Sequence, residues 1–231
     1  MLKISEIEDI YERQAVLDNL SQPDPEEIAP VVTVYYGHSF VNHFKTYNDQ
    51  LPWYMDNLGI PPFEGNLICQ GVGGATIARL RQDENLRTLM RHKPEIVVLE
   101  AGTNDLAKAD ISAKDACDAI LELVRDILDC RVREVVVCSV IRRGKKGMLR
   151  AVKEFPDKVV EFNHRVRYEL QFIPHTRFWN HRKLWDVELE DHLEDGTHLN
   201  NLGNKKLYRS LKGAVQYTAR LIRPAWSCYY C

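Results

Sequence analysis

Residues 31–40 read VVTVYYGHSF, an apolar run followed directly by Gly-His-Ser and a phenylalanine. The β-branched and aromatic side chains over 31–36 favour a strand, and their continuous apolar character indicates that both faces of this strand are buried. Gly37 and the polar residues after it predict a turn, and helical periodicity begins near residue 40. A buried strand that passes through a short turn into a helix is the unit from which parallel α/β sheets are built.

The same unit recurs along the rest of the chain. Four further runs have strand character, namely NLICQ (66–70), EIVVLEAG (95–102), REVVVCSV (133–140) and TRFW (176–179). Between the runs, periodicity predicts helices near 40–58, 76–92, 112–130, 156–173 and 201–222, the first of them ended or kinked by Pro52. The alternation predicts an α/β fold, a three-layer α/β/α sandwich around a mostly parallel sheet of five strands.

The length of 231 residues suits one main domain with a large core of its own. We expect an N-terminal helix and a proline-rich linker over 1–30, the main domain over 31–222 and a short tail over 223–231. Apolar residues make up 45% of the chain and charged residues 28%, which is typical of globular proteins and not of disordered or membrane proteins.

Charge and cysteine usage bear on partners and on the cellular compartment. The net charge of -2 does not favour a nucleic-acid partner, and no run of about 18 apolar residues predicts a transmembrane segment. The first residues are charged and polar, unlike those of a signal peptide. Cys69, Cys130 and Cys138 lie in apolar runs, where buried free thiols are usual. We therefore expect a cytoplasmic protein, with no indication of its oligomeric state.

No metal site is predicted from residue spacing. Cys228 and Cys231 form a Cys-x-x-Cys pair, but no second Cys or His pair stands near it at the spacing of a zinc finger. Six histidines show no paired spacing either, and we expect them to be surface or packing residues: His43, His92, His164, His175, His181 and His192.

Polar segments follow four of the predicted strands. They are Gly37-His38-Ser39, Gly71-Val72-Gly73-Gly74, Gly102-Thr103-Asn104-Asp105 and, past the fifth strand, Asp195-Gly196-Thr197-His198. In an open parallel sheet, functional residues gather at the carboxyl ends of the strands. We therefore expect these four segments to meet at one edge of the sheet.

The residue types in these segments suit nucleophilic catalysis. A serine hydroxyl becomes a good nucleophile when a base takes its proton, and the base needs a third group to orient it. Asp195 lies three residues before His198, so its carboxylate can reach Nδ1 of the imidazole while Nε2 faces Ser39. For the oxyanion, the candidate donors are the backbone N–H groups of Ser39 and Gly74 and the side-chain amide of Asn104.

In this order and composition the four segments resemble the blocks of the SGNH or GDSL-type hydrolases, over about residues 31–222. The resemblance implies a flavodoxin-like sandwich and hydrolysis of acyl esters through an acyl-enzyme, without metal or other cofactor. It assigns the nucleophile to Ser39, the base to His198 and its orienting group to Asp195, with Ser39, Gly74 and Asn104 as the oxyanion hole. The chain departs from the family pattern at His38 and Ala75, where related enzymes usually or often carry Asp.

A basic segment leaves the fourth predicted strand near the expected site. Arg142, Arg143, Lys145 and Lys146 form either a solvated loop or a surface that receives an anionic substrate, and Phe40 is a further candidate for substrate binding. The glycine run at 71–74 lacks the spacing of a dinucleotide-binding loop.

Together these observations predict a serine esterase, a carboxylic ester hydrolase that acts on a small-molecule ester. Two alternatives stay open. One is a non-catalytic or accessory SGNH domain, of the kind associated with retroelements, that binds nucleic acid or a membrane. The other is a thioesterase or lysophospholipase.

Overall fold

The computed structural model describes residues 29–48, 51, 54–184 and 187–223. The chain divides into two compact units, Met1–Pro30 and Val31–Cys231, and the second contains the fold. The predicted N-terminal helix, most of its linker, Pro52 and the Cys228 and Cys231 pair lie outside the described residues.

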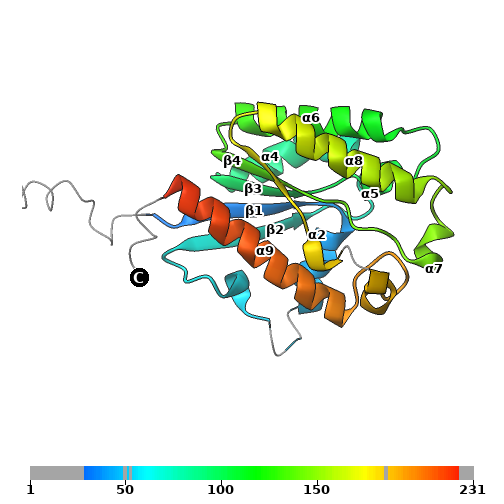
Figure 1. Cartoon of the computed structure of the whole chain (residues 1–231). Helices are drawn as coiled ribbons and strands as arrows, with labels where there is room; N and C mark the ends of the chain where they lie inside the picture. Colours follow the sequence, from blue (N-terminus) through cyan, green and yellow to red (C-terminus); the bar gives the residue numbers. More distant parts are fainter. Residues whose placement is uncertain (1–28, 49–50, 52–53, 185–186, 224–231) are drawn as a thin grey trace, which may run out of the picture. The chain divides into compact units, whose positions relative to one another are not determined.

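The centre of the fold is a sheet of five strands, and every strand pairing in it is parallel. The strands are β1 (Val31–Gly37), β2 (Gly65–Gly71), β3 (Ile96–Glu100), β4 (Glu134–Cys138) and β5 (Thr176–Trp179). Their order across the sheet is β2-β1-β3-β4-β5, which is the flavodoxin-like order. The predicted α/β sandwich is confirmed, and the sheet is wholly parallel (Figure 1).

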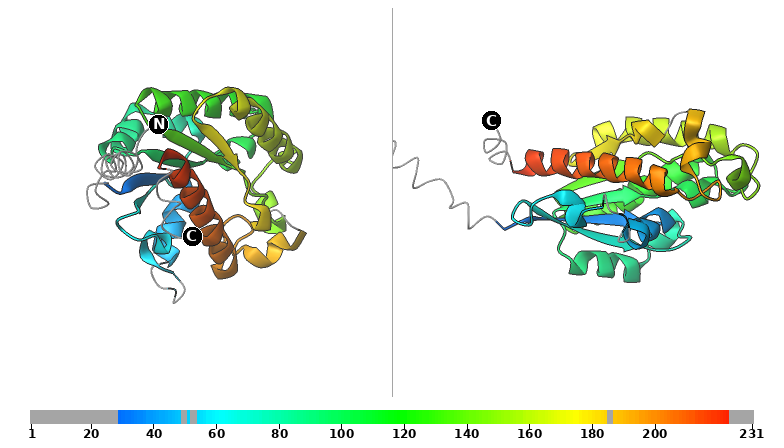
Figure 2. Two further views of the ribbon diagram at one scale, coloured as in Figure 1. Left: turned by 60° about the vertical axis from the view of Figure 1, so that its left-hand side comes forward. Right: turned by 90° about the horizontal axis from the view of Figure 1, so that it is seen from below.

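Helices cover both faces of the sheet (Figures 1 and 2). One core lies between the sheet and α3 (Ile77–Leu80), α4 (Asp83–Arg91), α6 (Ala113–Asp129) and α8 (Phe155–Glu169). The other core lies between the sheet and α2 (Ser39–Asn48) and α9 (Asn201–Ile222). The shorter helices are η1 (Asp56–Gly59), α5 (Thr103–Leu106), α7 (Lys145–Met148), η2 (Leu170–Phe172), η3 (Arg182–Leu184) and η4 (Val187–His192).

The two cores explain why the strand sequences are apolar throughout. Along β3, Val97 and Leu99 point into the core under α6 and α8, whereas Ile96 and Val98 point into the core under α9. Successive side chains of a strand alternate between its faces, so a strand covered on both sides needs apolar residues at every position.

Several helix boundaries differ from the prediction. The helix expected over 40–58 ends at Asn48, and the one expected over 76–92 is two helices, because the extended backbone of Gln82 interrupts it and starts α4. The four-residue helices α5 and α7 were not predicted, since so few residues show no helical period. Within the described ranges, no helix has both the length and the apolar content needed to cross a membrane.

Candidate active site

The turn after β1 holds Ser39 at the first residue of α2. Gly37 is required there, because a Cβ on it would overlap the carbonyl oxygen of Glu100 on the neighbouring strand β3. The backbone N–H of His38 donates to that same carbonyl at 3.2 Å. The end of β1 is thus tied closely to β3, and Ser39 follows two residues after the carboxyl end of β1.

Ser39, His198 and Asp195 come together in one line of hydrogen bonds. Nε2 of His198 lies 3.1 Å from Oγ of Ser39, and Nδ1 of His198 lies 3.0 Å from Oδ2 of Asp195. The serine and the histidine are 159 positions apart in the chain. The geometry suits proton transfer from the hydroxyl to the imidazole, with the carboxylate holding the ring.

The loop before α9 orients the carboxylate of Asp195. Its Oδ1 accepts backbone hydrogen bonds from Thr197 at 2.9 Å and His198 at 2.7 Å, while Gly196 takes a positive φ of 81° that closes the loop. Burial alone raises the pKa of Asp195, but the hydrogen bonds from His198 and Thr197 outweigh it and hold the pKa well below its usual value. The carboxylate is therefore ionised at every pH at which an esterase is normally assayed.

A hydrogen bond joins Asn104 to the glycine loop at Ala75, the residue after Gly74. The side-chain amide of Asn104 donates to the carbonyl of Ala75 at 2.9 Å, which fixes the orientation of its NH₂ group and leaves a second hydrogen on it. Gly74 has a φ of 66°, and a Cβ there would meet no atom within 4 Å, so the space before it is open. The glycine loop is tied in turn to the nucleophile turn, since Val72 N–H donates to Gly37 at 2.8 Å.

Asp105 has a structural role that the sequence analysis missed. Both oxygens of its buried carboxyl accept from the backbone N–H of Ile77, at 3.1 and 3.2 Å, where α3 begins. Burial raises the pKa of Asp105 to about 6, against the opposing effect of the hydrogen bond from Ile77. Asp105 and Asn104 thus fasten the glycine loop from two sides. In the sequence, the one indication of this role was that Asp105 directly follows the candidate site residue Asn104.

His38 accepts a backbone hydrogen bond at the start of α2, a role that the Asp usually found at this position in the family can also fill. The imidazole is 1% exposed, and its Nδ1 accepts the backbone N–H of Phe40 at 3.3 Å, in the first turn of α2. Burial lowers the pKa of His38 to about 4, Glu100 opposes this, and His198 and Arg143 lower it further. A neutral imidazole that accepts a backbone hydrogen bond therefore caps α2, as a carboxylate can.

His43, which was expected to be a surface or packing residue, is exposed and lies against the imidazole of His198. It stands one helical turn after Ser39 on α2, and the two histidine rings stack with centroids 4.5 Å apart and an interplanar angle of 25°. Partial burial and the nearby His198 lower the pKa of His43, with Asp195 and Glu194 opposing. The stack covers one face of the imidazole of His198 and keeps it in line with Ser39.

We expect charge at position 43 to act on the base. A lysine in His43→Lys places a permanent positive charge beside His198 and disfavours its protonated form, so the acid limb of kcat/KM moves to lower pH by about one unit. The neutral His43→Gln serves as the matched control and leaves the limb where it is. Measured pH profiles that coincide for the two variants would contradict this coupling.

The basic segment packs beside the loop of Asp195. Backbone N–H of Gly144 donates to Gly196 at 2.8 Å, and neither Gly147 nor Gly196 has room for a Cβ, because each backbone lies against the other. Arg143 turns inward: its guanidinium donates to Thr103 at 3.4 Å, and its Nε has no hydrogen-bond partner among the described residues. Exposed side chains are found at the other three predicted positions, Arg142, Lys145 and Lys146.

Phe40 is 6% exposed, and its ring makes an edge contact with His198 at 6.2 Å between centroids. It packs against His38 in the same way, at 5.0 Å. The structure therefore places Phe40 beside the base, where it helps to hold both imidazoles.

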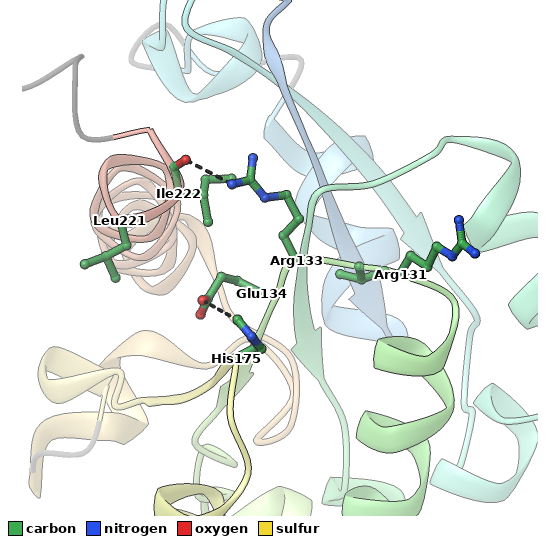
Figure 3. Close-up of a pocket in the computed structure, with 7 residues that line it drawn as sticks. Arg131, Arg133, Glu134, His175, Leu221 and Ile222 are labelled. Carbon is green, nitrogen blue, oxygen red and sulfur yellow. Dashed lines mark hydrogen bonds and ion pairs between the residues drawn. The ribbon is translucent and has the colours of Figure 1, made fainter.

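A separate hollow of about 350 Å³ lies at the opposite edge of the sheet, by the amino end of β4 (Figure 3). Three of its polar or charged side chains, those of Arg133, Glu134 and His175, have partners among the described residues. Arg133 donates to the carbonyl of Ile222 at 3.2 Å, and Nδ1 of His175 lies 3.4 Å from Glu134. This hollow belongs to the end of the fold away from Ser39.

Comparisons with known proteins bear on the family and on the fold. The model of the GDSL-like lipase/acylhydrolase family matches residues 32–206. No curated protein sequence matches the chain. A Bacteroides fragilis protein described as an acylhydrolase shares the fold with a TM-score of 0.69 and 18% identity, over 88% of this chain and 95% of that one.

Two further solved structures have the same fold. A GDSL-like lipase from Bacteroides thetaiotaomicron has a TM-score of 0.63 and 19% identity, over 90% of this chain and 97% of its own. An acetylxylan esterase from Geobacillus stearothermophilus, solved as a catalytic mutant, has a TM-score of 0.60 and 14% identity, over 80% and 94%. At these identities the likeness concerns the fold alone.

Proposed function

The chain belongs to the GDSL-like lipase/acylhydrolase family, and from this premise we propose that it is a serine esterase that hydrolyses small acyl esters through an acyl-enzyme. The observation that carries the proposal is the unbroken line of hydrogen bonds from Asp195 through His198 to Ser39. A hydroxyl, an imidazole and a carboxylate in this sequence form the arrangement that activates a serine nucleophile.

The first half of the reaction transfers the acyl group to Ser39. Oγ attacks the carbonyl carbon of the ester while Nε2 of His198 takes the hydroxyl proton, and Asp195 stabilises the resulting imidazolium. The tetrahedral oxyanion accepts hydrogen bonds from Ser39 N–H, Gly74 N–H and the Asn104 amide. The carbon–oxygen bond to the alcohol then breaks, and His198 returns its proton to the leaving alkoxide.

The second half releases the acid. His198 takes a proton from a water molecule as the water oxygen attacks the acyl-enzyme carbonyl, and the same three donors stabilise the second oxyanion. Collapse of this intermediate returns the proton to Oγ of Ser39 and frees the carboxylic acid. The ester and one water molecule are the reactants, and His198, Ser39 and the three donors are the groups that the chain supplies for these steps.

A small acyl group is the substrate class we propose. The fold neighbour from Geobacillus stearothermophilus is an acetylxylan esterase, which supports short acyl chains. The three exposed cations Arg142, Lys145 and Lys146 stand on the segment packed against the loop of Asp195, which supports an alcohol moiety that carries negative charge.

A substrate panel tests the function. We expect p-nitrophenyl acetate and butyrate to be hydrolysed faster than long-chain esters, thioesters or lysophospholipids, and anionic esters to lose kcat/KM as salt rises. Preference for a thioester or a lysophospholipid would replace the esterase assignment with the corresponding alternative. No turnover of any substrate, combined with salt-sensitive nucleic-acid binding, would favour an accessory binding domain.

A further inference from the structure

Three potential metal ligands converge at the carboxyl ends of three neighbouring strands, outside the catalytic line. Glu100 ends β3 and Cys138 ends β4, while His181 follows two residues after the end of β5. The pairing of Leu99 with Val137 puts the first two side by side. All three side chains are buried, with 1%, 0% and 1% of their surface exposed.

The donor atoms have the spacing of ligands around one cation. An oxygen of Glu100, the sulfur of Cys138 and a ring nitrogen of His181 all lie within 4.8 Å of one another. Nε2 of His181 is 3.1 Å from Oε2 of Glu100, and the hydroxyl of Tyr35 is 3.2 Å from the same oxygen. Zinc bonds of about 2.0–2.3 Å in a tetrahedron place neighbouring donors roughly 3.3–3.7 Å apart, so small shifts of side chains suffice.

The chemistry of the three donors also fits a divalent cation. Imidazole nitrogen, thiolate sulfur and carboxylate oxygen are the protein ligands of zinc, and thiolate selects it over harder cations such as Mg²⁺. One thiolate and one carboxylate carry two negative charges, which balance the charge of the ion in a site that excludes water.

A second contact orients the histidine toward the cluster. Nδ1 of His181 lies 2.8 Å from Oγ of Ser210 on α9, and Ser210 also accepts the indole N–H of Trp179 at 3.0 Å. Histidines that bind metals usually have their other ring nitrogen held in this way. The contact fixes Nε2 as the nitrogen that faces Glu100 and Cys138.

We propose that Glu100, Cys138 and His181 bind one zinc ion, with the hydroxyl of Tyr35, 3.2 Å from Oε2 of Glu100, beside the site. Binding displaces the thiol proton of Cys138 to solvent, and the ion then ties the ends of β3, β4 and β5 together. Because the ligands are buried, the ion stabilises the fold and does not contact the ester. The proposal is independent of the esterase function.

Zinc and cobalt titrations of chelator-treated protein test the site. Cys228 and Cys231 offer two further thiols, so the titrations use the chain with both replaced by serine beside the unaltered chain. We expect one ion per chain in both, a thiolate-to-cobalt charge-transfer band with Co²⁺, and a melting temperature raised by roughly 5 °C at saturating zinc.

Matched variants identify the ligands. Cys138→Ser abolishes the cobalt band and weakens zinc binding by about tenfold or more, whereas Cys117→Ser, which changes another buried thiol in the other core, leaves both unchanged. X-ray absorption of the zinc-loaded protein gives a check without mutation and should show one sulfur among nitrogen and oxygen ligands. The proposal is wrong if the chain without Cys228 and Cys231 binds no zinc, or if the band survives Cys138→Ser. The buried groups would then be joined by hydrogen bonds alone.

Discussion

Ser39→Ala lowers kcat for p-nitrophenyl acetate by about 10⁶-fold, because it removes the one oxygen that attacks the substrate. The fold should be retained. Ser39 is partly exposed, and the change deletes a single hydrogen bond to His198, which contributes about 1 kcal/mol to the free energy of unfolding.

A second hydroxyl on α2 offers the matched control. Thr46 donates to the carbonyl of Asn42 at 3.1 Å on the exposed side of the helix, so Thr46→Ala should leave kcat within about twofold of wild type. Initial rates and melting curves for the two variants separate loss of the nucleophile from loss of the fold. An Ser39→Ala variant with more than a few per cent of wild-type turnover would contradict the assignment.

Asp195→Asn should lower kcat by about 10⁴-fold while leaving the backbone of the loop in place. The asparagine carbonyl can still accept the two backbone N–H groups of Thr197 and His198, so its NH₂ faces the imidazole. That group donates to Nδ1, which forces the ring proton onto Nε2. Nε2 then has no lone pair with which to take the proton of Ser39.

The adjacent Glu194 provides the control for Asp195. It is an exposed carboxylate in the same loop, so Glu194→Gln removes the same charge without touching Nδ1 of His198. We expect its kcat to change by about threefold or less. If Asp195→Asn and Glu194→Gln behave alike in steady-state assays, the carboxylate at 195 does not hold the base.

The sheet and the candidate site were predictable for the same reason. Strands buried on both faces leave long apolar runs in the sequence, and the carboxyl edge of a parallel sheet collects whatever follows those runs. The sequence alone therefore predicts that four site residues lie at this edge, namely Ser39, Gly74, Asn104 and His198. The structure brings the first and last of these into hydrogen-bond contact.

Other contacts could not be predicted, because they join residues that no sequence period relates. The stack of His43 on His198 depends on where α2 and the loop before α9 meet. The cluster of Glu100, Cys138 and His181 depends on β3, β4 and β5 being neighbours in the sheet. That order of strands could not be predicted from the sequence. The break at Gln82 and the short helices α5 and α7 likewise follow from tertiary packing and not from local propensity.

His38 shows how a departure from a family pattern can preserve a role. The sequence shows His38 where related enzymes usually carry Asp, but it does not show which hydrogen bonds the imidazole makes. Burial keeps the imidazole neutral near pH 7, and Nδ1 then accepts the Phe40 N–H. The start of α2 is therefore capped without a charge next to His198.

The most direct test of the central claim is covalent labelling of Ser39. A fluorophosphonate probe reacts with a serine that an imidazole has activated, and intact-mass spectrometry counts the adducts. We predict one adduct per wild-type chain, located by peptide mapping at Ser39, and none on Ser39→Ala. No adduct on the folded wild-type chain, or an adduct that remains on Ser39→Ala, would contradict the account.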